Sequence, residues 1–297
     1  MRIASMIASA TEIVHALGLA EFQVARSHEC DWPLTVKDLP VCTRPRFDIS
    51  GSSLEIDKRV KETLAKDGTL YEVFPEILNA VAPTHIITQT QCKVCAVSME
   101  DVERAVSSSV ASHPEVIACE PNSLQAIFDD INRIAGRCGY PQRGLDLVAS
   151  LQERMSVMGE QISKSAPVRV ACIEWIEPLM AAGNWTPELV KIAGGINLFG
   201  EEGKHSPWME WQDLVAARPE VVIVMPCGFG LERTRDDLHW ITDRPEFPGP
   251  AQWFLADGNH YFNRPGPRVV ECVRILAEIL HPQVFKPRLE GVAWQRL

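Results

Sequence analysis

Two cysteines with the spacing CxxC, Cys92 and Cys95, follow an apolar run in the segment TQTQCKVCAVS. Such a pair can exchange a disulfide, supply half of a zinc site or line a binding pocket. Disulfide exchange is typical of thioredoxin-like folds, which the rest of the chain does not resemble, and a zinc site needs further ligands. The chain has no second CxxC and no His-x3-His. We therefore interpret the pair first as a tight turn or pocket wall, second as a metal site and third as a redox pair.

The segment SHECDWP brings four potential metal ligands together: His28, Glu29, Cys30 and Asp31. Neighbouring side chains of an extended chain point in opposite directions, so these four do not all reach one ion. Together with Cys92 and Cys95, His28 could complete a metal site. The alternative is a polar loop that ends at Pro33.

The sequence contains none of the common catalytic motifs. There is no G-x-S-x-G nucleophile turn, no P-loop and no H-E-x-x-H metal site. Nothing in the pattern requires catalysis, and we predict a binding protein rather than an enzyme. The alternative is a metal-binding or thiol-dependent enzyme, or a metallochaperone, that uses Cys92 and Cys95.

The charge balance and hydropathy exclude two kinds of partner. The chain has 297 residues and a net charge of −10, without a basic cluster, whereas nucleic-acid binding needs a positive surface that neutralises phosphates. No apolar stretch reaches the length of about 18 residues that a membrane-spanning helix needs. The N-terminus already reads as strand, turn and helix, without a signal peptide before it. We expect a cytoplasmic protein, or a periplasmic one if a leader has been removed.

Short runs of β-branched residues alternate with helical patterns along most of the chain. This alternation predicts an α/β fold with parallel sheets covered by helices. The expected strands are 2–8, 84–89, 115–119, 168–175, 220–225 and 251–256. The expected helices are 11–18, 52–66, 74–81, 98–106, 211–218 and 267–280, and Ser52 and Glu55 have the spacing of a capping box.

The segment 122–163 is helical nearly throughout, with one break at Gly139. It is too long for an ordinary crossover, and the stretches before and after it repeat a similar order of elements. We therefore predict two Rossmann-like α/β lobes, residues 1–121 and 166–297, joined by a long rigid helical segment, residues 122–165. Ligands of such folds bind at the carboxyl ends of parallel strands and between domains, so we expect a ligand cleft between the lobes.

Seven of the eight tryptophans fall in the second half of the chain. Trp185, Trp208 and Trp211 lie in or beside predicted loops, and Phe229 lies in the loop MPCGFG. A loop position favours exposure to a ligand, and a flat ring gives a large contact area at a low entropic cost. We therefore expect a broad, partly apolar ligand that contacts Trp185, Trp208 and Phe229.

Eight segments carry a resemblance to a known family: IASATEIVHALGL, RSHECDWP, SSLEI, APTHIITQ, the long helix from Asn122, KIAGGINLF, KHSPWMEWQDLVAARPEVVIV and NRPGPRVVECVRIL. In this order the chain resembles the cobalamin- and iron-siderophore-binding proteins of ABC importers, and most closely their cobalamin binders. The resemblance implies two α/β lobes joined by one rigid helix, with the ligand held between them. The segment QCKVCAV is absent from the standard binders and looks like the signature of a leaderless subgroup.

The resemblance also implies which residues contact the ligand. Matched position by position, the loops of the cobalamin binders nominate seven residues: His28, Glu29, Arg44, Gln91, Trp208, Asn259 and Arg264. Members of the family have tryptophans at the position of Arg44 and near that of Gln91, and this chain does not. The expected ligand is cobalamin, a related corrinoid or another metal–organic complex. His28 or a cysteine thiolate is a candidate ligand of its metal, and a separate metal ion is a candidate at Cys92 and Cys95.

In this family, two glutamates, one per lobe, dock the protein onto arginines of the membrane permease. Glu55 matches the first glutamate, and the second falls near Gln212, where Glu210 is the candidate. An ABC permease is therefore a candidate partner. We expect a protein for intracellular handling or salvage of a corrinoid, or for its uptake, and the alternative is an importer subunit whose leader has been trimmed.

Overall fold

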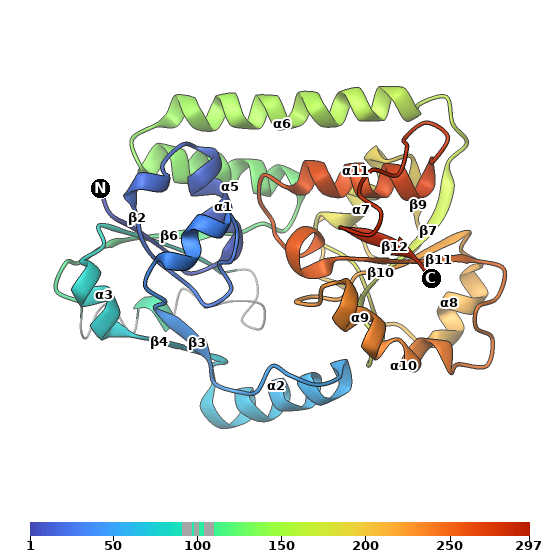
Figure 1. Cartoon of the computed structure of the whole chain (residues 1–297), viewed down its shortest axis with the longest axis horizontal. Helices are drawn as coiled ribbons and strands as arrows, with labels where there is room; N and C mark the ends of the chain where they lie inside the picture. The colour runs from blue at the N-terminus through green and yellow to red at the C-terminus, as the bar shows by residue number, and fades with distance from the viewer. Residues whose placement is uncertain (91–96, 98–100, 104–109) are drawn as a thin grey trace. The chain divides into compact units, whose positions relative to one another are not determined.

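A computed structural model describes residues 1–90, 97, 101–103 and 110–297 of the chain (Figure 1). Each of its two compact units has its own sheet and its own core, so the predicted fold class, two α/β lobes with parallel sheets, is confirmed. The predicted lobe boundaries stay a prediction. The first unit consists of Met1–Gly51, Lys58–Pro121 and Gln125–Ala149, and the second consists of Ser52–Asp57, Asn122–Leu124 and Ser150–Leu297.

The first unit is built on a parallel sheet with the strand order β2-β1-β5-β6. Ala4 of β1 lies beside Ile86 of β5, and both side chains are fully buried in one apolar cluster with Leu78. Burial on both faces is the reason why strands of parallel sheets read as apolar runs. The strands are β1 (Ile3–Ser5), β2 (Gln23–Arg26), β5 (His85–Gln89) and β6 (Glu115–Cys119), and an antiparallel pair is formed by β3 (Thr43–Pro45) and β4 (Tyr71–Val73).

The capping box predicted at the start of α2 is confirmed. The Ser52 N–H donates to Glu55 Oε2 over 2.9 Å, and the Glu55 N–H donates to Ser52 Oγ over 3.3 Å, so both exposed backbone donors are satisfied. The predicted helix over 98–106 falls largely outside the described residues. The other helices before the linking segment are α1 (Ala8–Ala16), η1 (Ala20–Phe22), η2 (Leu34–Asp38), α2 (Ser53–Asp67) and α3 (Pro75–Val81).

The linking segment forms two helices, α5 (Leu124–Arg137) and α6 (Pro141–Ile162), with the predicted break between them. Gly139 has a φ of +83°, which only glycine adopts without strain. Its N–H donates to Gly136 O, which satisfies a carbonyl at the end of α5. Pro141 then begins α6, where its fixed φ suits the first helical position.

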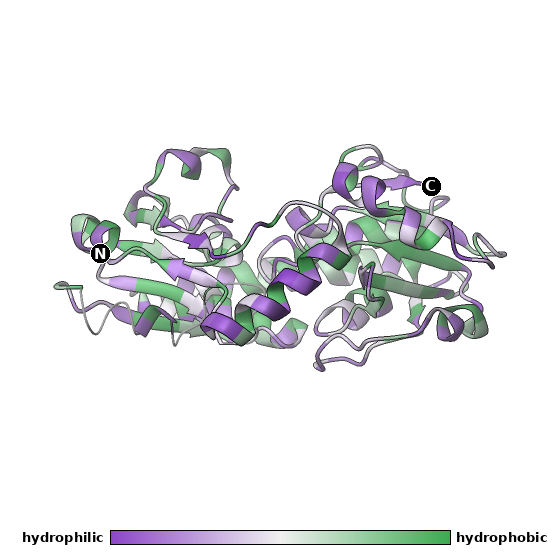
Figure 2. Ribbon diagram, turned by 90° about the horizontal axis from the view of Figure 1, so that it is seen from below, coloured by the Kyte–Doolittle hydropathy of each residue, from purple (hydrophilic) through white to green (hydrophobic). Residues whose placement is uncertain are grey.

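The second unit has a sheet with the order β12-β11-β10-β7-β8, and β9 pairs with β7. Its central strands are parallel, whereas β12 and β8 are antiparallel edge strands that the sequence did not reveal. In Figure 2 the strands of this sheet are mainly green, which agrees with their buried apolar side chains. The strands are β7 (Val168–Trp175), β8 (Met180–Ala181), β9 (Gly195–Asn197), β10 (Val221–Val224), β11 (Gln252–Ala256) and β12 (Trp294–Arg296).

Two more helices of the second unit were predicted and are present. These are α8, which carries its own capping box between Glu210 and Asp213, and the buried helix α11.

No helix among the residues that the structure describes is long and apolar enough to cross a bilayer. The helical segments of this unit are α7 (Thr186–Ile192), α8 (Trp211–Ala217), α9 (Leu231–Asp237), α10 (His239–Thr242), the π-helical turn η3 (Gly258–Phe262) and α11 (Val269–Leu280).

Candidate binding site

The loop that contains His28 follows the carboxyl end of strand β2 in the first unit. The His28 N–H donates to Thr43 Oγ1 over 3.1 Å, and the ring nitrogen Nδ1 lies 2.8 Å from the same oxygen. The ring centroid of Tyr71 lies 5.5 Å from that of His28. Burial lowers the pKa of His28 to about 4, and the charge of Arg26 adds to the effect. His28 is therefore neutral at pH 7 and held in one orientation.

Arg26 organises the rest of this loop. Its guanidinium donates to the carbonyl oxygens of Ser27, Cys30 and Lys37 over 3.1–3.2 Å. Cys30 is fully buried, and burial raises the pKa of its thiol, so this thiol packs in the core and does not act as a surface thiolate. Of the possible metal ligands in SHECDWP, Cys30 is thus turned inward.

The structure describes only one of the three residues of the predicted metal site, His28. Gln91, Cys92 and Cys95 lie outside the described residues, so a metal ion or ligand contact there stays a prediction. Within the described parts of the chain, no group of three or more His, Cys, Asp and Glu side chains could hold a metal ion. Glu29 Oε1 lies 4.0 Å from His28 Nε2, which is a loose pair rather than a coordination geometry.

Arg44 lies on the antiparallel pair beside this loop. Its Nε donates to Glu72 Oε2 over 2.7 Å, and its guanidinium lies 5.4 Å from the centroid of the Phe74 ring. The charge of Arg44 is therefore balanced by Glu72, although the side chain is exposed. An exposed guanidinium beside an aromatic ring can still contact a flat or anionic ligand.

In the second unit, Phe229 of the loop after β10 contacts Trp175 at the end of β7 and Arg233 of α9. The ring of Phe229 meets that of Trp175 edge to face, with centroids 5.4 Å apart, and the guanidinium of Arg233 lies 4.0 Å from the Phe229 centroid. Phe229 itself is only 1% exposed. Its burial indicates that it supports the half-buried Trp175 and Arg233, neither of which the sequence singled out. The sequence did contain a signal for Trp175, because it is the last residue of the predicted strand 168–175 and ligands bind at the ends of parallel strands.

The loop after β11 is fastened to the loop after β10 through the backbone. The Asn259 N–H donates to Phe229 O over 3.0 Å. A side chain at Gly258 would place its Cβ 2.1 Å from Pro226 O, so only glycine fits there. The buried Arg264 donates from Nε to Asn259 O over 2.7 Å, which fixes the far end of the loop. Asn259 and Arg264, both nominated as ligand contacts, thus lie on one rigid loop.

The expected exposure of the tryptophans is right for one of them and wrong for two. Trp208 is 58% exposed. Trp185 is only 6% exposed, and its indole N–H donates to Phe262 O over 3.1 Å. Trp211 is also buried, stacked near Trp253, and donates to Glu246. An indole whose N–H finds an internal acceptor packs in the core even when it lies next to a loop.

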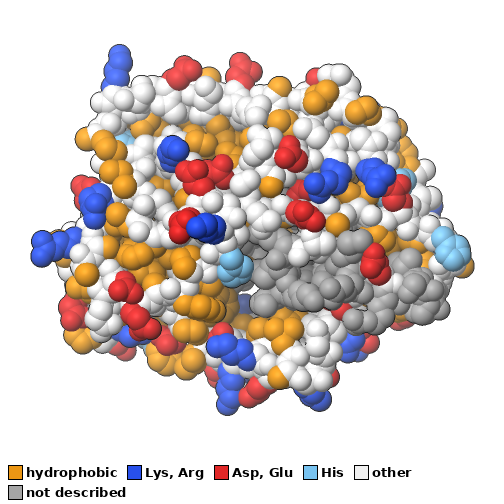
Figure 3. All heavy atoms as spheres, turned by 180° about the vertical axis from the view of Figure 1, so that it is seen from behind, with side chains coloured by type: hydrophobic (Ala, Val, Ile, Leu, Met, Phe, Trp, Pro, Cys, Tyr) orange, Lys and Arg blue, Asp and Glu red, His pale blue; other side chains and the backbone are white. Residues whose placement is uncertain are grey.

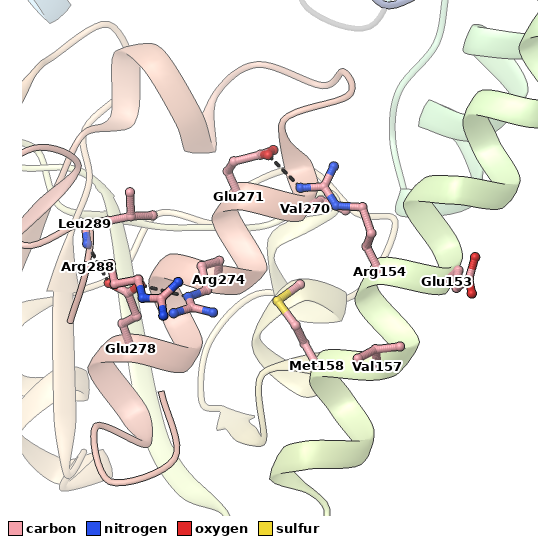
Figure 4. A pocket seen from close by; sticks show the side chains of 10 residues that line it. All are labelled: Glu153, Arg154, Val157, Met158, Val270, Glu271, Arg274, Glu278, Arg288 and Leu289. Atoms are coloured by element: carbon pink, nitrogen blue, oxygen red, sulfur yellow. Dashed lines mark hydrogen bonds and ion pairs between the residues drawn. The ribbon is translucent and has the colours of Figure 1, made fainter. Parts of the chain in front are cut away.

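A pocket of about 540 Å³ lies elsewhere in the second unit, between α6 and α11 (Figure 4). Its polar groups are largely paired with each other: Arg154 with Glu271 over 2.9 Å, and Arg274 with the fully buried Glu278 over 2.8 Å. The pocket lies along helices and not at strand ends, so we place the candidate site at the strand ends. Its lining residues are Glu153, Arg154, Val157, Met158, Val270, Glu271, Arg274, Glu278, Arg288 and Leu289.

The chain is similar to known binding proteins. A family model described as "Periplasmic binding protein" matches residues 3–247. The chain belongs to this family. Members named vitamin B12-binding protein, from Yersinia pestis (strain Pestoides F) and Yersinia pseudotuberculosis serotype O:1b (strain IP 31758), are 20% identical over 281 residues, which is 93% of this chain and 85% of each relative.

Solved structures of periplasmic binding proteins share the fold. A periplasmic haem-binding protein from Pseudomonas aeruginosa superposes with a TM-score of 0.72 at 17% identity, over 99% of this chain and 97% of that one. The periplasmic vitamin B12 binding protein BtuF of Vibrio cholerae gives a TM-score of 0.64 at 17% identity, over 93% and 94%. At this identity the likeness concerns the fold alone.

Membership of the periplasmic binding protein family bears on two expectations. The matched proteins are described as binding proteins and not as enzymes, which agrees with the predicted class. Their names do not support the expected cytoplasmic location, whereas the alternative, a periplasmic location, fits them.

The two candidate docking glutamates of this periplasmic binding protein are both exposed. Glu55 lies in the first turn of α2 and Glu210 caps α8. The implied arrangement, one docking glutamate per lobe, stays a prediction. At the start of α2, the Ser53 N–H donates to Asp237 Oδ2 over 3.0 Å, and Ser53 Oγ accepts from the Glu177 N–H over 3.1 Å.

Proposed function

We propose that this chain binds a flat metal–macrocycle, a corrinoid such as cobalamin above all, and presents it to an ABC permease. The observation that carries the proposal is the alignment of 93% of the chain with proteins named vitamin B12-binding. Structural neighbours named as vitamin B12- and haem-binding proteins support the wider class of ligand. The expectation that the ligand lies in a cleft between the lobes stays part of this proposal.

The residues at the strand ends suit such a ligand. A macrocycle needs apolar ring faces against its own and a few polar groups around its rim. Trp208 and Trp32 are exposed, and Trp175 is half-buried over the buried Phe229. Asn259, whose backbone N–H is bonded to Phe229 O, supplies a side-chain amide for a polar substituent of the ring.

The charged surface fits a small-molecule cargo better than a nucleic acid. On the face drawn in Figure 3, Lys and Arg side chains are interspersed with Asp and Glu side chains. The net charge of −10 also disfavours the binding of phosphate groups. It does not hinder an amide-rich corrinoid.

Titration with a panel of ligands tests the proposal. Purified protein is titrated with cyanocobalamin, haemin and a ferric siderophore, and binding is followed by calorimetry and absorbance. We expect the tightest binding for the cobalamin, and a loss of about two- to tenfold in Trp208→Ala, since a ring contact contributes about 0.5–1.5 kcal/mol. The matched control is Val292→Ala, which removes another exposed apolar side chain. A protein that binds none of the three ligands would contradict the proposal.

A second role is tested separately, because the CxxC spacing of Cys92 and Cys95 also suits a metal-binding or thiol-dependent protein. An intracellular carrier or a thiol-dependent metal handler would use these residues directly. Metal analysis of protein purified without chelators, compared with Cys92→Ala and Cys95→Ala variants, separates this role from plain ligand binding. Fractionation of cells that express the full-length gene distinguishes a carrier inside the cell from an importer subunit.

A further inference from the structure

The pocket between α6 and α11 joins an apolar wall to a charged end (Figure 4). Val157 and Met158 of α6 and Val270 of α11 form the apolar wall. Met158 also packs against a buried cluster that contains Phe285, so the wall is continuous with buried side chains of the second unit. The pocket volume of about 540 Å³ lies within the range of pockets that hold small molecules. The pocket therefore has room for an apolar chain.

The charged end of the pocket is held by one carboxylate, that of the fully buried Glu278. Its Oε1 accepts from Arg274 Nε over 2.8 Å, and its Oε2 accepts from the Leu289 N–H over 2.9 Å and from the Trp294 indole N–H over 3.0 Å. Hydrogen bonds to a carboxylate are among the strong ones in proteins. Glu278 thus fixes Arg274, and also the backbone next to Arg288, before any ligand binds.

Two arginines at the charged end have hydrogen-bond donors to spare. A guanidinium carries five N–H groups. Among the residues that the structure describes, Arg274 donates a hydrogen bond from Nε alone, and the exposed side chain of Arg288 donates none. Both side chains line the pocket, and Figure 4 shows them on the same side of it. Two like charges in one pocket favour an anion between them, and the planar fork of a guanidinium suits a carboxylate.

The charged residues around the pocket also predict the charge of this anion. Arg154 and Arg274 are each paired with a glutamate, over 2.9 and 2.8 Å. The remaining acidic residue of the lining, Glu153, points away from α11 in Figure 4. The charge of Arg288 is therefore the one left unbalanced inside the pocket. A single positive charge matches a monoanion, whereas a doubly charged group would add to the repulsion from the two paired glutamates.

We propose that this pocket binds a small amphipathic carboxylate, such as a medium-chain fatty acid, as a second ligand of the protein. The carboxylate lies between Arg274 and Arg288, and the alkyl chain lies along the apolar wall. The pocket is separate from the candidate site at the strand ends. Binding there goes beyond the proposed function and does not depend on it.

Calorimetric titration of the full chain at pH 8 with three probes tests the proposal. The probes are decanoate, decyltrimethylammonium, which has the same alkyl chain and a positive head, and decyl phosphate, which is largely a dianion at this pH. All three are used below their micelle concentrations. We expect decanoate to bind at one site per chain, decyl phosphate to bind more weakly, and decyltrimethylammonium not to bind. No binding of decanoate, or binding of another probe as tightly as decanoate, overturns the proposal.

Two variants locate decanoate binding in this pocket. Arg288→Gln should weaken the binding about tenfold or more, since it removes a hydrogen bond between two charged groups. Val157→Asp should weaken it by a similar factor, because it places a negative charge on the apolar wall. Both side chains are exposed, so neither change should disturb folding, and thermal unfolding followed by circular dichroism checks this.

Lys286→Gln is the matched control for Arg288→Gln. It removes one positive charge from an exposed position in the same segment, but Lys286 does not line the pocket. An exposed charge outside the pocket is screened by salt, so the affinity for decanoate should change by less than about twofold. Equal losses in Arg288→Gln and Lys286→Gln, or unchanged affinity in both Arg288→Gln and Val157→Asp, would overturn the assignment to this pocket.

Discussion

The strand-end loops of the two units are fixed by different kinds of contact. In the first unit, His28 and Arg44 are held by side-chain partners, Thr43 and Glu72. In the second unit, the loops after β10 and β11 are joined through backbone atoms, and Gly258 leaves no space between them. The first pair contains a titratable imidazole and the second an ion pair, so both can respond to pH, whereas the contacts at Gly258 depend on the space that each residue occupies. Substitutions should therefore act differently in the two units.

Gly258→Ala should have the largest effect. A Cβ at 2.1 Å from Pro226 O and 2.6 Å from Met225 O cannot be accommodated without moving one of the two loops. We expect a loss of about 3–5 kcal/mol in the free energy of unfolding, measured by denaturant titration. Gly136→Ala is the control, because its Cβ meets nothing within 4 Å inside helix α5, and it should stabilise by about 1 kcal/mol. Equal effects of both changes would show that the close approach at Gly258 does not limit the stability of the second unit.

Asp130 should give the first unit a stability that falls as pH rises. Burial raises the pKa of Asp130 to about 7, although Arg133 opposes the effect. Between about pH 4 and 7 the folded state binds more protons than the unfolded state, so the free energy of unfolding decreases with pH, by at most about 1.4 kcal/mol per pH unit. Asp130→Asn should remove this slope in urea titrations at several pH values. An unchanged slope would show that Asp130 does not titrate in this range.

His28 should give the opposite slope in the same unit. Its pKa is lowered to about 4 by burial and by the charge of Arg26. The unfolded state binds more protons between about pH 4 and 6.5, so stability increases with pH in that window and is lost as the pH falls. His28→Gln should flatten this increase in the free energy of unfolding, measured by urea titration at several pH values. Arg44→Gln is the control, because it removes no titrating ring and should keep the increase. The slopes expected from His28 and Asp130 have opposite signs, so a plot of the wild-type free energy of unfolding against pH would show neither clearly.

The smallest effect on stability is expected for Glu55→Gln combined with Glu210→Gln. Each side chain is exposed and caps its own helix, so the loss should be about 1 kcal/mol in total. Ligand affinity should not change. If these residues dock a permease, stimulation of its ATPase activity by the loaded protein should decrease strongly, while Glu62→Gln, on the exposed face of α2, should have no effect.

The sequence predicted what apolar patterning controls. The runs THIITQ and EVIAC became β5 and β6, and VRVACIEW became β7, because parallel strands buried on both faces need continuous apolar side chains. Capping at Ser52 and the break at Gly139 were equally visible, since these depend on local backbone chemistry. The short strand β2, with the sequence QVAR, was missed because half of its residues are polar.

The candidate site was harder to predict, because it depends on packing between distant segments. Trp185 and Trp208 have similar loop positions in the sequence, but Trp185 donates to Phe262 O and is buried, whereas Trp208 is 58% exposed. The side chain of Asp257 accepts the His260 N–H in a π-helical turn, a geometry that no sequence pattern announced. Pairings of this kind become visible only when the backbone path is known.

The first turn of α2 has a practical consequence for dissecting the molecule. Ser53 satisfies Asp237 and the Glu177 backbone, and the chain passes from one compact unit to the other at several points. A fragment that starts after residue 121 would expose those two partners to solvent and lose the groups that saturate them. Anyone who wishes to produce the C-terminal half as an independent protein should graft residues 52–57 back onto it, or replace Asp237 with an apolar side chain.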